Sequence, residues 1–204
     1  MRLFSALLPP APAVSELAAA VAELRALPGA DRLRWTQRAG WHFTLAFYGE
    51  VPDELVPRLS ERLGRAARRH RPLTLRLTGG GRFGDRTLWA GAEGDLQAVA
   101  RLAATAAAAG RRAGIPVEEH LRYTPHLTLA RGRGVDLRPF AARLAGFAGT
   151  EEWTVGELAL IRSHPPAPGV AGAQPHYEPL TVRPLGRAAT DAAGGAAGDG
   201  AGDG

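Results

Sequence analysis

The spacing of apolar residues along the chain predicts a mixed α+β fold. Several segments alternate apolar and polar residues or form short apolar runs, as strands do, whereas others place apolar residues three or four positions apart, as helices do. We expect strands at 3–8, 41–48, 73–77, 86–90, 127–130, 153–161 and 177–182, and helices at 15–27, 53–70, 96–109 and 137–144. The strands at 73–77 and 86–90 are predicted to form a hairpin across the Gly-rich turn between them.

The length of 204 residues suits one domain with its own core. We place this domain at residues 1–186. The remaining segment, 187–204, contains only Ala, Gly, Asp, Thr and Arg, too little apolar surface to offset the entropy of ordering it, and is expected to be a disordered tail.

Lysine and cysteine are both absent, and this excludes several kinds of chemistry. Without lysine, the glycine-rich segment cannot be a phosphate-binding NTPase loop, and neither lysine adenylation nor a Schiff base is available. Without cysteine there are no thiol nucleophiles, zinc ribbons or disulfides. The net charge of +5 comes from arginine alone. It favours an anionic partner such as RNA or a phosphate ester, although genome base composition explains an arginine-only pattern equally well.

No apolar run approaches the roughly 20 residues that span a bilayer, and the first residues lack a convincing signal-peptide cleavage site. We therefore expect a cytoplasmic protein that does not bind membranes. No feature indicates an obligate dimer, so a monomer is expected.

Two short segments share one pattern and carry the candidate chemistry: His42-Phe-Thr44-Leu and His126-Leu-Thr128-Leu. In a strand, residues two apart share a face, so each copy presents an imidazole and a hydroxyl together, with apolar residues behind them. If the two strands lie side by side, four polar groups converge on one point, which suits a tetrahedral oxyanion. The alternative is that both histidines are ordinary polar residues on half-buried strands.

Opening a cyclic phosphate needs a base and an acid, and this set of groups supplies both. One histidine accepts a proton from water and the other protonates the departing sugar oxygen, while threonine hydroxyls donate to the nonbridging oxygens. The scheme needs neither a cofactor nor a metal. No His-Glu-x-x-His or comparable ligand pair occurs among the six histidines, so no metal site is expected.

The chain resembles the RNA 2′,3′-cyclic phosphodiesterases, the LigT-like branch of the two-histidine phosphoesterases, over roughly residues 2–185. The resemblance rests on the two histidine segments, supported by Arg2-Leu-Phe, Leu88-Trp-Ala-Gly, Ile161-Arg-Ser and Tyr177. It implies a bilobal, pseudo-symmetric fold, in which each lobe is a small antiparallel sheet with outer helices and the active site lies in the central cleft. It also implies that His42 protonates the leaving 3′ oxygen while His126 activates water, giving a 2′-phosphate.

The resemblance adds a third candidate for substrate binding beside Thr44 and Thr128. Arg131 resembles the family's phosphate-contacting arginine, but strict strand alternation from His126 would turn it to the opposite face, so it needs a bulge or a strand end. Tyr177 and Phe83 offer faces on which a base could stack, although Phe83 is expected in the core.

The resulting functional hypothesis is hydrolysis of RNA 2′,3′-cyclic phosphate ends. The alternatives are ATP-independent 2′–5′ RNA ligation or cleavage, hydrolysis of small cyclic nucleotides or ADP-ribose cyclic phosphate, and a non-catalytic RNA- or nucleotide-binding module.

Overall fold

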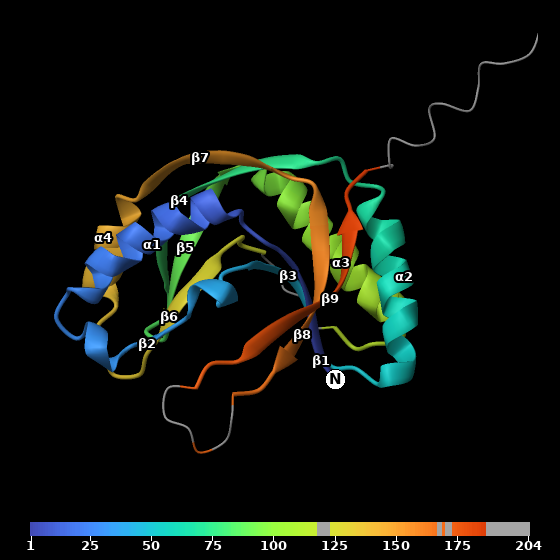
Figure 1. Ribbon diagram of the computed structural model, residues 1–204, viewed down its shortest axis with the longest axis horizontal. Coiled ribbons are helices and arrows are strands. Elements are labelled where there is room, and N and C mark those ends of the chain that lie inside the picture. Colours follow the sequence, from blue (N-terminus) through green and yellow to red (C-terminus); the bar gives the residue numbers. More distant parts are fainter. Residues whose placement is uncertain (118–122, 167–168, 170–172, 187–204) are drawn as a thin grey trace, which may run out of the picture.

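Two antiparallel sheets, each covered by a pair of helices, form the fold (Figure 1). The computed structural model describes residues 1–117, 123–166, 169 and 173–186. The predicted tail at 187–204 lies outside the described residues. The α+β class and the bilobal arrangement of sheets and outer helices are as predicted.

The first sheet has the strand order β3-β1-β8-β9. Its strands are β1 (Arg2–Leu7), β3 (Phe43–Glu50), β8 (Glu157–His164) and β9 (His176–Pro184). Helices α2 (Val56–Ala67) and α3 (Leu96–Arg112) cover it: α3 packs against β3, and α2 packs against α3 and β9.

The second sheet has the strand order β2-β6-β5-β4-β7. Its strands are β2 (Arg34–Trp35), β4 (Leu73–Phe83), β5 (Thr87–Gly94), β6 (Leu127–Arg131) and β7 (Ala148–Val155). It is covered by α1 (Ala11–Arg25), which packs against β7, and by α4 (Arg138–Ala145), which packs against β4. Three short 3-10 turns, at Ala30–Arg32, Arg38–Gly40 and Asp53–Leu55, complete the regular structure of the described residues.

The two lobes repeat one chain path. In each lobe, a first strand is followed by a helix that packs on the sheet of the other lobe. The chain then returns as a second strand that pairs with the first, and it continues into a helix that packs on the sheet of these two strands. These elements are β1, α1, β3 and α2 in one lobe and β5, α3, β6 and α4 in the other. Because each crossing helix covers the opposite sheet, buried residues of both lobes belong to one large hydrophobic cluster.

Several predicted boundaries are wrong for identifiable reasons. The strand predicted at 153–161 is two strands, since β7 pairs with β4 in one sheet and β8 pairs with β1 in the other, and the chain changes sheets at Gly156. Only Gly156 separates the two strands, so the apolar pattern does not reveal the change. Helix α1 begins at Ala11 rather than 15, because Pro12 occupies its first turn, where proline's missing N–H costs nothing. The helix predicted at 53–70 is a 3-10 turn followed by α2, and β2 was not predicted.

The triple glycine lies inside β4 and does not turn the hairpin, which reverses at Gly84 with a positive φ of 54°. A Cβ atom on Gly80 would lie 2.4 Å from the carbonyl oxygen of Trp89 and 2.3 Å from the Leu144 side chain. Glycine is therefore required here by the close approach of β5 and α4 to β4.

Candidate active site

Each histidine stands immediately before a strand rather than inside it: His42 precedes β3 and His126 precedes β6. The predicted alternation holds in both segments. Phe43, Leu45, Leu127 and Leu129 are buried, whereas the histidines and threonines are only partly buried. The sequence suggested convergence of the four polar groups if the two strands lay side by side. They do not, since β3 belongs to the first sheet and β6 to the second.

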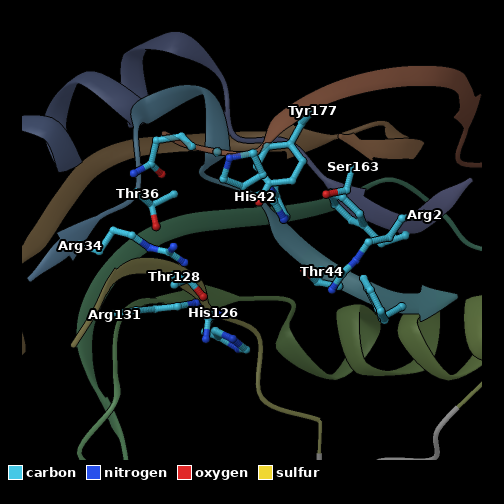
Figure 2. A pocket seen from close by; sticks show the side chains of 15 residues that line it. Arg2, Arg34, Thr36, His42, Thr44, His126, Thr128, Arg131, Ser163 and Tyr177 are labelled. Atoms are coloured by element: carbon cyan, nitrogen blue, oxygen red, sulfur yellow. The ribbon is translucent and has the colours of Figure 1, made fainter. Parts of the chain in front are cut away.

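A single cavity of about 240 Å³ brings together every residue predicted for the site. His42, Thr44, His126, Thr128 and Arg131 all line it, and Figure 2 shows the two histidine segments on facing walls. The other lining residues are Arg2, Phe4, Arg34, Thr36, Gly40, Phe47, Ser163, Gln174, Pro175 and Tyr177. None of these described residues carries a carboxylate, so the cavity is electropositive and suits an anion.

His42 is held between two aromatic rings of the first sheet. Phe4 of β1 stacks on the imidazole with a centroid separation of 4.7 Å, and Tyr177 of β9 meets it edge-on at 5.1 Å. Burial disfavours the charged imidazolium, and a charge on His126 repels it further. Together these effects lower the pKa of His42 from its usual 6.5 to about 4. His42 is therefore neutral at pH 7 in the free protein.

His126 is oriented by a hydrogen bond of 2.8 Å between its Nδ1 and the carbonyl oxygen of Thr124. A carbonyl only accepts, so Nδ1 carries the proton and Nε2 of the neutral ring keeps its lone pair. Burial lowers the pKa of His126, the hydrogen bond to Thr124 opposes this change, and the charge of Arg131 adds to it. His126 is thus a neutral base of defined tautomer.

Phe83 meets the His126 ring edge-on at a centroid separation of 4.8 Å and stacks on Trp89 at 5.2 Å. The expectation that Phe83 packs in the core is wrong, because its side chain is 40% exposed. The long β4 strand extends past the glycines and brings this ring to the site. Each histidine therefore has aromatic neighbours from its own sheet.

Arg131 reaches the cavity because β6 contains a bulge. In the pairing of β6 with β5, Thr128 and Ala130 have partners on consecutive β5 residues, and Leu129 is skipped. Leu129 and Ala130 are both buried, so the alternation shifts by one and turns Arg131 to the same side as Thr128. The guanidinium also lies 3.4 Å from the hydroxyl of Thr87.

Tyr123 connects the two histidine segments. Its hydroxyl donates a hydrogen bond of 2.8 Å to the backbone carbonyl of Thr44, although Tyr123 itself lies three residues before His126. Burial raises the pKa of this phenol, so it remains a protonated donor. The separation between the two motifs is therefore set by a direct contact as well as by the core.

Sequence reasoning did not assign Arg2, Arg34, Thr36, Ser163 or Gln174 to the site, yet all five line the cavity. Arg2 lies two residues before Phe4 in β1 and shares its face, and the structure places both on the cavity. The others depend on which strands meet across the cavity, which local pattern does not specify.

Among the residues that the structure describes, no group of three or more His, Asp or Glu side chains is placed to hold a metal ion. In the same residues, no helix is both long enough and apolar enough to cross a membrane.

Residues 13–166 match the 2′-5′ RNA ligase superfamily. An RNA 2′,3′-cyclic phosphodiesterase from Geobacillus stearothermophilus is 30% identical over 157 residues, which are 74% of this chain and 47% of that protein, so the match spans about half the length of this relative. An RNA 2′,3′-cyclic phosphodiesterase from Aquifex aeolicus is 25% identical over 136 residues, 64% of this chain and 72% of that protein. The apo crystal structure of E. coli LigT superposes with a TM-score of 0.73 at 26% identity and covers 91% of this chain and 98% of LigT; LigT complexed with 3′-AMP matches with a TM-score of 0.71.

Proposed function

The chain belongs to the 2′-5′ RNA ligase superfamily, and from this premise we propose that it hydrolyses RNA 2′,3′-cyclic phosphate ends to 2′-phosphates by metal-independent acid–base catalysis. The observation that carries the proposal is the convergence of His42, Thr44, His126, Thr128 and Arg131 on one cavity free of carboxylates. The names of the two curated relatives support the same reaction, and the 3′-AMP complex of E. coli LigT supports a nucleotide in the cavity.

His126 is the general base. Its Nδ1 proton is committed to the carbonyl of Thr124, which leaves Nε2 as the acceptor on the side of the cavity. Water loses a proton to Nε2 as its oxygen bonds to phosphorus. A lowered pKa keeps His126 unprotonated near pH 7, so the base is in its working form before substrate binds.

His42 is the general acid, and it protonates O3′ as the bond from phosphorus to O3′ breaks. The free protein holds His42 neutral, with a pKa of about 4. A bound cyclic phosphate brings a negative charge next to the imidazole, which raises its pKa and stabilises the imidazolium. Substrate binding and protonation of His42 are therefore coupled, so the acid is charged when an anion is present.

Thr44, Thr128 and Arg131 hold the nonbridging oxygens of the phosphate. The two hydroxyls donate without adding charge, and the guanidinium supplies a fixed positive charge that stabilises the oxyanion in the transition state. All three lie on the cavity wall beside a histidine. This divides proton transfer and charge stabilisation between different side chains.

The same site could join RNA instead of hydrolysing it, and the description of the superfamily favours this as the second candidate. A 5′-hydroxyl would replace water as the nucleophile, O3′ would again leave, and the product would be a 2′–5′ phosphodiester. No nucleotide is needed to drive the exchange of one phosphodiester for another. Water far exceeds any 5′-hydroxyl in dilute solution, so hydrolysis dominates there.

The test uses purified protein and an RNA oligonucleotide that ends in a 2′,3′-cyclic phosphate, incubated with and without EDTA. We expect a 2′-phosphate product in both conditions and its loss in His42→Ala and His126→Ala. An intact RNA end with wild-type protein would refute the proposal. Turnover of 2′,3′-cyclic mononucleotides alone, or nucleotide binding without turnover, would then identify one of the remaining alternatives. A parallel reaction with a 5′-hydroxyl RNA measures ligation.

A further inference from the structure

Because the two histidines have different roles, the substrate has a defined orientation in the cavity. Entering water and departing O3′ lie in line on opposite sides of phosphorus. With His126 beside the water and His42 beside O3′, the ribose that carries O3′ lies against the first sheet, which supplies His42. The rest of the RNA continues from the 5′ carbon of that ribose, so it also leaves the cavity along this wall.

Arg2 and Phe47 occupy this wall and have no role in the reaction described above. They lie on adjacent strands, β1 and β3, and both line the cavity. The Arg2 guanidinium carbon lies 5.0 Å from the centroid of the Phe47 ring, a cation–π contact that holds the charge in place. Phe47 is 44% exposed, so this contact lies at the open rim of the cavity and not in its interior.

The position of Arg2 separates it from the reacting phosphate. Phe4, which stacks on His42, is two residues further along β1, and two strand residues span about 7 Å. Figure 2 shows Arg2 on one side of the histidines and the other two lining arginines, Arg34 and Arg131, on the opposite side. No carboxylate among the described residues forms a salt bridge with Arg2, so its guanidinium is available to an anionic ligand.

We propose that Arg2, held over the ring of Phe47, binds the phosphodiester immediately upstream of the terminal nucleotide and makes the protein prefer RNA chains of two or more nucleotides over cyclic mononucleotides. The inference rests on the proposed function and names the part of the substrate that the reaction itself does not require. Arginine suits this role because its planar fork pairs with two phosphate oxygens at once. Arg34, on the wall of His126, faces the water side and is the matched control.

The experiment compares kcat/KM for a 2′,3′-cyclic mononucleotide with that for a dinucleotide ending in the same cyclic phosphate. We expect the wild type to favour the dinucleotide. Arg2→Gln should reduce kcat/KM for the dinucleotide about tenfold, chiefly through KM, and leave the mononucleotide unchanged. Phe47→Leu should give a smaller loss of the same kind, since it removes the support of the guanidinium and not its charge. Arg34→Gln should affect both substrates equally.

A third substrate tests whether Arg2 acts through the negative charge of the upstream phosphodiester. In a dinucleotide whose internucleotide linkage is an uncharged methylphosphonate, wild type and Arg2→Gln should have equal kcat/KM values, because the partner of the arginine is gone. Equal losses on both natural substrates in Arg2→Gln would overturn the inference and place Arg2 on the reacting phosphate. Selective loss in Arg34→Gln would overturn it by reversing the direction of the cavity. If wild type hydrolyses both substrates without preference, this inference fails while the proposed function stands. An intact end on the RNA oligonucleotide of the earlier assay means instead that the function itself fails.

Discussion

The partly buried, neutral imidazole of His42 makes folding stability depend on pH. The pKa of His42 is about 4 in the folded protein against 6.5 for the exposed group, so the unfolded chain binds a proton more readily in this range. Above pH 6.5 the imidazole is neutral in both states, and His42 does not favour unfolding. As the pH falls from 6.5 towards 4, the unfolded chain gains a proton that the folded protein does not bind, so the free energy of unfolding decreases. Between pH 7.5 and pH 5 these two pKa values correspond to a loss of roughly 2 kcal/mol. The ring borders an open cavity, so this value is an upper limit.

Urea unfolding of wild type and His42→Gln at pH 7.5 and pH 5 measures this contribution. Glutamine does not titrate, so the variant should lose less stability than wild type over this interval, by up to about 2 kcal/mol. The comparison subtracts the groups that titrate independently of His42. His126 interacts with His42, so the measured difference contains the repulsion between the two rings as well as the burial of His42. Carboxylates whose pKa values are lowered, such as Glu16, stay ionised at pH 5. Equal pH-dependent losses in both proteins would refute the assignment of a buried neutral imidazole.

Three further substitutions test individual contacts. Tyr123→Phe removes the hydrogen bond to the carbonyl of Thr44 and should lower the free energy of unfolding in urea by about 1 kcal/mol. It should also lower kcat with KM little changed, and an unchanged kcat would show that the contact does not position the histidines. Arg131→Gln should reduce kcat/KM for a cyclic mononucleotide by about 10²-fold or more, and a loss confined to longer RNA would contradict its proposed contact with the reacting phosphate. Gly80→Ala places a Cβ 2.4 Å from the carbonyl oxygen of Trp89 and should destabilise the protein by about 2 kcal/mol or more, measured as a fall in the unfolding midpoint; wild-type stability would mean that β4 and β5 separate readily.

Local pattern predicted most elements of the fold, because burial on one face leaves a period in the sequence. Helices α1 and α2 were recognised for this reason, with boundaries displaced by a few residues. The errors occurred where a change of partner leaves the local pattern intact. At Gly156 a single residue separates a strand of one sheet from a strand of the other. At Gly80 a glycine that suggests a turn instead permits close packing within a strand.

The sequence by itself determined which groups are available to the site. Two His-x-Thr segments, an arginine close behind the second, and the absence of lysine and cysteine are properties of the chain at any level of structure. Only the tertiary structure decided how these groups meet. It placed the segments on facing walls, turned Arg131 inward through a bulge at Leu129, and enclosed His42 between Phe4 and Tyr177. The physical reason is that side-chain identity is local, whereas pKa, orientation and convergence depend on contacts between residues far apart in the chain.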